Sequence, residues 1–254
     1  MDQALTHPQF TAIAPYYDLL MKDVNYDRWL WYVGEIFKLF QHNPRTILDL
    51  ACGTGTCSVL LAKEGYRVTG LDSSEAMLRV AREKAKREGV RVDYMNERME
   101  DFALRRRVDA VICLFDSLNY ILDEGEMLNT YRCTHDSLAP GGLFIFDMNT
   151  EYGLAEGWGD PEFVKEEEEI VSIWRNEYDR VAKLARLALT LFVAEGDHYI
   201  RIDEVHLERA YSPRKVKDLL RQAGFSDVRV YRHLTFKRLD SMTKRAMVVG
   251  KKPP

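Results

Sequence analysis

The stretch that decides the fold is Ile47-Leu48-Asp49-Leu50-Ala51-Cys52-Gly53-Thr54-Gly55-Thr56-Cys57. Its apolar run is typical of a buried strand, and its two glycines are typical of a tight turn from a strand into a helix. A second apolar run ends at Asp72, 19 residues beyond Gly53. This is the layout of a nucleoside-binding β-α-β unit, in which the acid binds the ribose hydroxyls. Capping of the next helix is the alternative role for Asp72.

Asp49, which comes just before the glycines, narrows the choice of ligand. Its negative charge opposes a pyrophosphate at the turn and attracts an ammonium group. A nicotinamide-dependent oxidoreductase is one alternative, and it predicts a third glycine at position 58, where this chain has Ser58. S-adenosylmethionine carries an adenosine, an ammonium and a sulfonium but no phosphate, so it matches this turn better than a dinucleotide does.

The composition limits the class of protein. The chain has 254 residues, of which 46% are hydrophobic and 30% charged, as expected of one large globular domain or a domain with an insert. A net charge of -4 gives no general attraction to nucleic acid or to an anionic membrane, and no apolar run is long enough to span a membrane. The four cysteines lack the paired spacing of metal ligands. We therefore expect reduced thiols, no metal and a cytoplasmic location.

Strands and helices alternate through most of the chain. An amphipathic helix over 26–40 comes first, and apolar strands then alternate with helices. We predict strands at 46–51, 66–71, 90–95, 108–114, 142–148, 227–233 and 244–250, and helices at 55–64, from 74, near 124–138 and after Ser212-Pro213. Such alternation predicts an α/β fold with a Rossmann-like, seven-stranded, mostly parallel sheet and helices on both faces.

The pattern changes after Asn149 to that of an antiparallel insert. Every second residue from Leu187 to Val193 is Leu or Val, and Glu195-Gly196-Asp197 is a plausible hairpin turn. In the strand that follows, the apolar residues change from even to odd positions, which predicts a β-bulge near Asp203-Glu204. The expected organisation is a core of 1–149 and 211–254, whose residues 1–40 form a helical lid, and an antiparallel β insert of 150–210.

Four ordered blocks resemble the class I S-adenosylmethionine-dependent methyltransferase family, namely Asp49–Gly55, Gly70–Leu78, Val108–Cys113 and Leu138–Phe144. The N-terminal pattern Tyr17-Asp18-x-x-Met21-x-Asp23-x-x-Tyr26-x-x-Trp29 is similar to that of bacterial and archaeal small-molecule methyltransferases. These are related to amino-sugar and glycine/sarcosine N-methyltransferases. The resemblance implies S-adenosylmethionine as cofactor and a small-molecule acceptor that is methylated at nitrogen rather than oxygen. The chain lacks the Asn/Asp-Pro-Pro-Tyr sequence of enzymes that methylate DNA bases.

The resemblance also assigns residues to the cofactor. Asp49 would hold the ammonium, directly or through water, and Asp72 would bind the ribose. Gly53 and Gly55 would let the backbone approach the methionine part. The full set of predicted cofactor-binding residues is Tyr17, Asp49, Ala51, Cys52, Gly53, Gly55, Asp72, Ser73, Met77, Met99, Glu100, Phe115 and Asn119.

The adenine end departs from the family pattern. Relatives often place an Asp before the hydrophobic residue that covers adenine, whereas this chain has Arg98 before Met99. Arginine cannot accept a hydrogen bond from the adenine amino group. Glu100 or Asp101 would then make that contact, while Met99 covers the ring.

Candidate catalytic residues come from the lid and the insert. In relatives an N-terminal tyrosine covers the cofactor, so Tyr17 is the aromatic candidate, with a core aromatic as its alternative role. A base is optional for methyl transfer to an amine, and His206, Glu204 and Tyr211 are the possible bases at the end of the insert. A structural histidine is the alternative for His206. Asp147, at the end of the fifth strand, should also lie at the ligand-binding edge.

The sequence thus predicts a methyltransferase, either monomer or homodimer, whose insert forms the acceptor pocket. A non-catalytic, S-adenosylmethionine-binding regulatory module is an alternative because methyl transfer has no obligatory side chain. A macromolecular acceptor is a further alternative, which the acidic charge disfavours.

Overall fold

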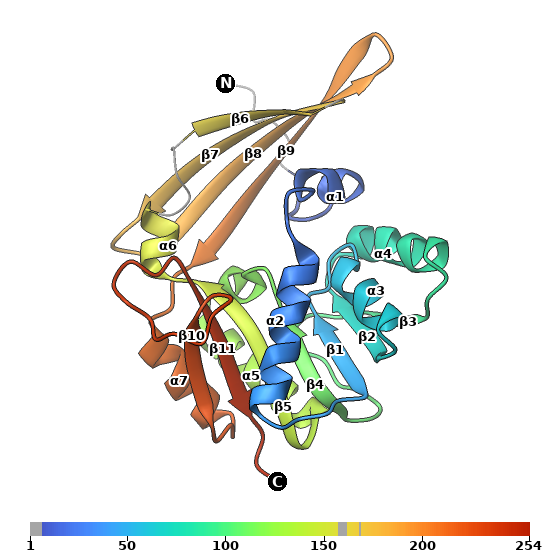
Figure 1. The fold of residues 1–254 in the computed structure, drawn as a ribbon. Helices are drawn as coiled ribbons and strands as arrows, with labels where there is room; N and C mark the ends of the chain where they lie inside the picture. The colour runs from blue at the N-terminus through green and yellow to red at the C-terminus, as the bar shows by residue number, and fades with distance from the viewer. Residues whose placement is uncertain (1–6, 157–161, 168) are drawn as a thin grey trace.

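The larger of two sheets has seven strands in the order β10-β11-β5-β4-β1-β2-β3. The computed structural model describes residues 7–156, 162–167 and 169–254 (Figure 1). Strand β11 is antiparallel to both of its neighbours, and β1 to β5 are parallel to one another. The strands are β1 (Thr46–Leu50), β2 (Arg67–Asp72), β3 (Val92–Asn96), β4 (Val108–Cys113), β5 (Leu138–Asn149), β10 (Val228–Arg232) and β11 (Arg245–Lys251). The predicted mostly parallel sheet is confirmed.

Helices cover both faces of this sheet, as the alternation predicts. On one face, α2 (Tyr26–Leu39) and α3 (Thr56–Lys63) pack on apolar side chains of β1, β4 and β5, and α4 (Glu75–Arg87) lies beside α3. On the other face, α5 (Glu124–Ser137) and α7 (Pro213–Gln222) cover the opposite side chains of the same strands. Alternate residues of each strand thus enter different cores, as the period-two geometry of a strand requires.

The smaller sheet is an antiparallel meander that stands over one end of the core (Figure 1). It follows a short helix, α6 (Glu151–Glu156), and consists of β6 (Glu162–Glu167), β7 (Ile170–Asp179), β8 (Leu184–Glu195) and β9 (His198–Arg209). The alternation of apolar residues and the turn at 195–197 correctly predicted the β8–β9 hairpin. The edge strand β6 falls in a charge-rich segment and was not predicted as a strand.

The predicted bulge at Asp203-Glu204 is wrong, because β8 and β9 pair without a register shift from Leu184 with Arg209 to Glu195 with His198. The change of apolar positions has another cause. The buried face of β9 continues from Ile202 into three polar residues, Glu204, His206 and Glu208, each 2% exposed or less. Burying polar groups is costly unless they are paired, so we expect these three residues to have partners at the inner face of the insert.

The N-terminal segment is attached to β9 by one carboxylate. Glu204 accepts hydrogen bonds of 2.7 to 3.1 Å from the backbone N–H groups of Phe10, Thr11, Ala12 and Ile13. Behind this segment follow a 3-10 turn, η1 (Ala14–Tyr16), and a short helix, α1 (Tyr17–Leu20). The segment therefore lies between the insert and the core. Within the described ranges, no helix has both the length and the apolar character needed to cross a bilayer.

Candidate active site

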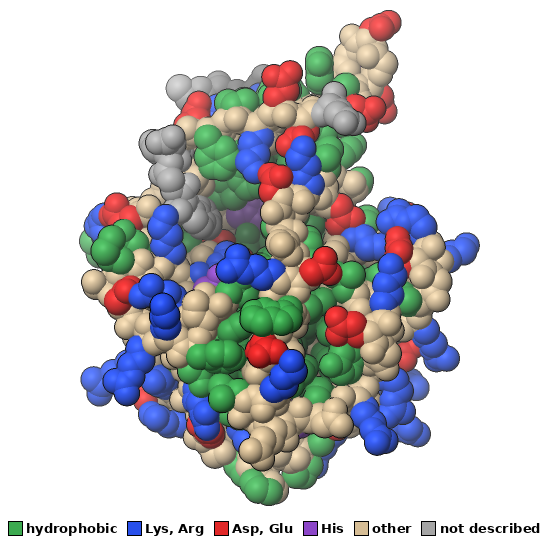
Figure 2. Space-filling model, in the orientation of Figure 1, with side chains coloured by type: hydrophobic (Ala, Val, Ile, Leu, Met, Phe, Trp, Pro, Cys, Tyr) green, Lys and Arg blue, Asp and Glu red, His purple; other side chains and the backbone are tan. Residues whose placement is uncertain are grey.

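A cavity of about 830 Å³ lies where the carboxyl ends of the core strands face the insert and the N-terminal segment. In open α/β sheets, ligands bind at this edge, at the point where the strand order reverses. Here the reversal falls between β1 and β4. Figure 2 shows a hollow beneath the insert, with histidine side chains inside it. The cavity has a half built by the ends of β1 to β3, called the cofactor half below, and a half built by the ends of β4, β9 and β11, called the acceptor half.

Strained backbone marks the ends of β1 and β4 at this edge. Ala51 has φ of 59°, and the consecutive residues Phe115 and Asp116 have φ of 61° and 53°. Non-glycine residues rarely adopt this left-handed conformation, and such strain concentrates at functional sites. All three residues line the cavity.

The two glycines of the turn have different tasks. Gly53 (φ +54°) lines the cavity, and a Cβ added to it meets no protein atom within 4 Å. This open space suits the close approach of a ligand to the backbone. At Gly55, an added Cβ would lie 2.9 Å from the Cβ of Ala81 and 2.5 Å from the hydroxyl of Tyr94. Gly55 thus permits the packing of α3 against α4 and β3, and it does not line the cavity.

Asp72 organises the turn and also faces the cavity. Its carboxylate accepts 2.8 Å hydrogen bonds from the N–H groups of Gly53 and Ser74. Burial raises the pKa of Asp72, while these hydrogen bonds oppose that shift. Each carboxylate oxygen has a further lone pair for a ligand hydroxyl. Asp72 can therefore cap the helix and bind a ribose at the same time, and its remaining lone pairs fit the ribose hydroxyls of an adenosine.

Asp49 lies beneath the turn and does not line the cavity. Its side chain accepts a 2.6 Å hydrogen bond from the hydroxyl of Ser58, the residue that stands where a dinucleotide-binding turn would have its third glycine. Burial raises the pKa of Asp49 to about 7 despite this bond. Because Asp49 is 3% exposed and does not line the cavity, its predicted contact with an ammonium would run through water.

At the adenine end, Arg98 makes an ion pair with Glu100 and lies 3.8 Å from Glu126. Met99 and Glu100 both line the cavity. Arg98 therefore fixes the carboxylate that was predicted to replace the missing Asp. Asp101 does not line the cavity.

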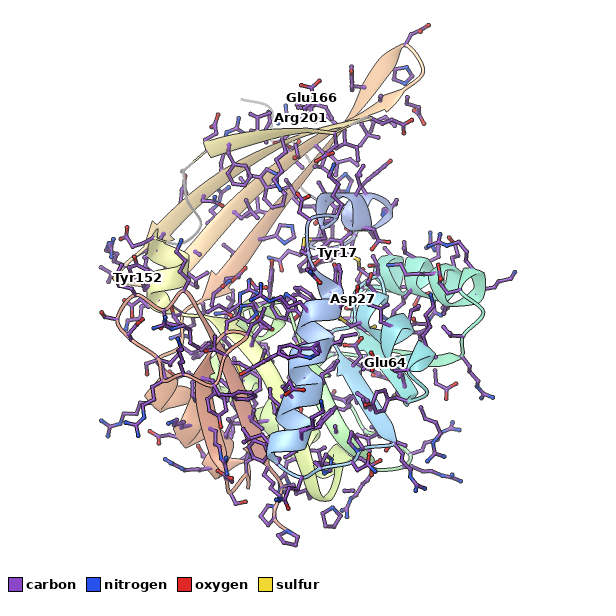
Figure 3. The ribbon with its side chains drawn as sticks, in the orientation of Figure 1. Tyr17, Asp27, Glu64, Tyr152, Glu166 and Arg201 are labelled. Atoms are coloured by element: carbon purple, nitrogen blue, oxygen red, sulfur yellow. The ribbon has the colours of Figure 1, made fainter. Side chains whose placement is uncertain are left out.

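Tyr17 lies in the lid, between the insert and the end of β1 (Figure 3). Burial raises the pKa of its hydroxyl, and the nearby carboxylates of Asp116 and Asp72 add to the shift. Those two acids belong to different halves of the cavity. Tyr17 thus stands where the cofactor half meets the acceptor half.

A buried lysine, which the sequence analysis missed, holds the lid to the glycine turn. Lys84 donates to Asp18 at 2.8 Å, to the hydroxyl of Thr54 at 3.1 Å and to that of Thr56 at 2.7 Å. Thr54 also donates to Asp18 at 2.6 Å. The network ties α1, which carries Tyr17, to the turn.

A cluster of charged and polar side chains from three strands and a loop lies at the base of the acceptor half. Arg245, at the start of β11, lies 3.0 Å from both Asp116, which follows β4, and Asp147 of β5. Asn149 donates to Asp116 and, at 3.0 Å, to Glu208 of β9. The sequence predicts that Asp147 and the segment after β4, which includes Asp116, lie at this edge, whereas Glu208 and Arg245 are cavity residues that it does not predict. Their positions in sequence are far apart, and no local motif joins them.

His206 lines the cavity beside this cluster. Its Nδ1 is 3.4 Å from the hydroxyl of Tyr120, and its Nε2 is 3.2 Å from Glu204 without hydrogen-bond geometry. Glu204 is committed to the N-terminal segment, which removes it from the possible bases. Tyr211 is also removed, because its hydroxyl donates to the carbonyl of Ile121 at 2.8 Å and its ring packs in the core.

The cavity brings together most of the predicted site residues. Those that line it are Tyr17, Ala51, Gly53, Asp72, Ser73, Met77, Met99, Glu100, Phe115 and His206. Those that do not are Asp49, Cys52, Gly55 and Asn119. Asn119 has a different task from the predicted one, since its amide donates to the carbonyls of Asn149 (3.2 Å) and Arg209 (2.9 Å). It joins the ends of β5 and β9 beneath the cavity.

Comparison with known proteins agrees with this fold. The methyltransferase domain family matches residues 47–142. A protein of Geobacillus sp. (strain WCH70) that is named as a methyltransferase is 33% identical over 245 residues, covering 96% of this chain and 99% of its own. The chain belongs to the class I S-adenosylmethionine-dependent methyltransferases, which use S-adenosylmethionine as cofactor. The nicotinamide alternative is thereby wrong.

Two further relatives extend the comparison. The crystal structure of an S-adenosylmethionine-dependent methyltransferase from Clostridium acetobutylicum superposes with a TM-score of 0.85 at 28% identity, over 95% of this chain and 98% of that one. Glycine N-methyltransferase of Rattus norvegicus is 32% identical over 158 residues, which are 57% of this chain and 52% of that protein.

Proposed function

We propose that this protein transfers the methyl group of S-adenosylmethionine to a small-molecule acceptor at nitrogen. The observation that carries the proposal is the two-part cavity, in which a turn suited to the cofactor opens into a second, acid-rich half beneath the insert. A cavity of this size suits a cofactor with a small acceptor beside it. The partial match to a glycine N-methyltransferase and the acids of the acceptor half support nitrogen.

The proposed cofactor site uses the cavity-lining residues of the sequence prediction. Gly53 and Ala51 would lie against the methionine part, Asp72 would bind the ribose, and Met99 with Glu100 would hold adenine. When bound, S-adenosylmethionine supplies an electrophilic methyl carbon, which an acceptor attacks through a lone pair. In-line placement is the main requirement of such a transfer.

Two predicted catalytic residues have positioning roles in this proposal. Tyr17 would close the cavity at the junction of its halves, and its hydroxyl stays protonated because burial raises its pKa. His206 would fix the Tyr120 hydroxyl at the wall of the acceptor half. The insert of 150–210 would form the acceptor pocket and exclude water.

The proposed setting is cytoplasmic, with no nucleic-acid or membrane partner and a monomeric or homodimeric state. The four cysteines are free thiols, as expected of a reducing compartment. The acidic net charge supports a small acceptor over a nucleic acid.

The test is isotopic methyl transfer from S-adenosylmethionine to a fractionated metabolite extract. We expect label in a low-molecular-mass, cation-exchange-retained fraction. Binding of S-adenosylhomocysteine without any transfer would favour the non-catalytic module. Label in protein or nucleic acid would favour a macromolecular acceptor. Failure to bind S-adenosylhomocysteine would overturn the proposal.

A further inference from the structure

One carboxylate of the acceptor half, that of Glu208, makes no ion pair in the described part of the chain, although the more distant charge of Arg245 lowers its pKa. Glu208 is 2% exposed and lines the cavity, yet the hydrogen bond that it accepts comes from the neutral amide of Asn149. Buried carboxylates are normally paired with a cation or supplied with several donors. Glu204, four residues earlier on the same face of β9, receives four backbone donors. A cationic ligand could therefore provide the ion-pair partner that Glu208 lacks.

The cation nearest in the cluster is already neutralised. Arg245 lies 3.0 Å from each of two acids, Asp116 and Asp147. Oδ1 of Asp147 is itself buried without a hydrogen-bond partner. The cluster thus holds three acids against one arginine, and an added positive charge would restore the balance.

The other groups that face Glu208 do not supply this charge. The Tyr120 hydroxyl, whose pKa is raised by burial and then by Glu208, stays neutral. On the far wall, His233 also stays uncharged at neutral pH, because burial and then the positive charges of Arg245 and Arg28 lower its pKa to about 4. The two ring nitrogens of His206 face other groups, since its Nε2 lies 3.2 Å from Glu204 and its Nδ1 lies 3.4 Å from the Tyr120 hydroxyl.

The roof of the same half is apolar. Phe163 and Trp174 stack with their ring centroids 5.6 Å apart and line the cavity together with Leu187 and Leu189 of β8. A ligand that places a charge near Glu208 therefore meets aromatic and aliphatic side chains with its other end. Burial of an apolar part of the ligand against these aromatic and aliphatic side chains is favourable.

Resting on the proposed methyltransferase function, we propose that the acceptor is an amine with an apolar group and that Glu208 binds its ammonium and takes one proton from it. The N–H bond breaks, its electron pair stays on nitrogen, and the proton bonds to a Glu208 oxygen. The amine then has the lone pair that methyl transfer requires. Burial, reinforced by Asp116, raises the pKa of Glu208, which makes its carboxylate a better proton acceptor.

The experiment measures binding of 2-phenylethylamine and of 2-phenylethanol by calorimetry, with the full chain saturated with S-adenosylhomocysteine. We expect the amine to bind at least about tenfold more tightly than the alcohol, because only the amine supplies the charge. In buffers of different ionisation enthalpy near neutral pH, its binding should release a proton, because the raised pKa favours a proton on Glu208 in the free protein and the incoming ammonium displaces it to the buffer. The later transfer from the ammonium to Glu208 is internal and exchanges no proton with the buffer.

The matched variants are Glu208→Gln and Glu177→Gln. Glutamine at 208 can still accept from Asn149, so we expect normal S-adenosylhomocysteine affinity with loss of the amine preference and of proton release. Glu177 is exposed on β7 and outside the cavity, so its variant should behave as the wild type.

Equal affinity of the wild type for amine and alcohol, or no amine binding by protein that binds S-adenosylhomocysteine, would overturn the inference. So would a Glu208→Gln variant that keeps the preference and the proton release. Wild-type protein that fails to bind S-adenosylhomocysteine would instead overturn the proposed function.

Discussion

The cofactor half and the acceptor half of the cavity are built in opposite ways. The cofactor half takes its glycine turn and its acid from one continuous stretch, Asp49 to Met77, which forms a single β-α-β unit. The acceptor half joins side chains up to 129 residues apart, as in the contact of Arg245 with Asp116. A site made by local chain geometry can be recognised from sequence, whereas a site made by tertiary packing has no local pattern.

Substitutions in the two halves are expected to affect the binding of different ligands. The largest effect is expected for Asp72→Ala, which removes the carboxylate that holds Gly53 and Ser74 and faces the ribose position. Each charge-assisted hydrogen bond contributes roughly 1.5–3 kcal/mol. Calorimetry with S-adenosylhomocysteine should show an affinity loss of at least about tenfold. Asp93→Ala on the neighbouring strand, where the side chain is 70% exposed, is the control. Unchanged affinity in Asp72→Ala would separate Asp72 from the ribose.

Two alanine substitutions test the separate roles of Gly53 and Gly55 in the turn. Gly55→Ala should lower the free energy of unfolding by roughly 2–5 kcal/mol, since left-handed strain adds to the clash with Ala81 and Tyr94. Gly53→Ala meets no protein atom, so roughly 1–2 kcal/mol of strain is expected, together with weaker S-adenosylhomocysteine binding. Denaturant unfolding and calorimetry measure the two effects separately. The assignment fails if Gly53→Ala binds normally or if Gly55→Ala is as stable as the wild type.

A further effect, spread over several pH units, is expected in the pH dependence of stability at Asp49. Because its pKa is about 7 in the folded protein and near 4 when unfolded, the folded state holds the extra proton between these values. Stability therefore falls as pH rises through this window, by up to about 1.4 kcal/mol per pH unit from this group. Asp49→Asn should reduce the fall, because asparagine does not titrate and its carbonyl still accepts from Ser58. Parallel pH profiles of unfolding would contradict this expectation.

Much of the fold follows from sequence because its signals are local. Periodicity and turn residues located the strands of the core, and the glycine turn with Asp72 located the cofactor half. The bulge prediction failed because it assumed that the inner face of β9 stays apolar. Three buried polar residues of β9 contradict that assumption, namely Glu204, His206 and Glu208. Their burial depends on partners elsewhere in the chain, such as the N–H groups of the N-terminal segment and the amide of Asn149. Gly55 and Asn119 lie outside the cavity for a related reason, since a motif gives residue types but not which of them faces the ligand.

The attachment of the lid has a kinetic consequence. Glu204 is 1% exposed and holds four consecutive backbone N–H groups of residues 10–13. These bonds share one carboxylate, so a change at Glu204 acts on all four of them. We expect ligand exchange to require release of these bonds and of the separate Lys84 network, with a residence time set by both.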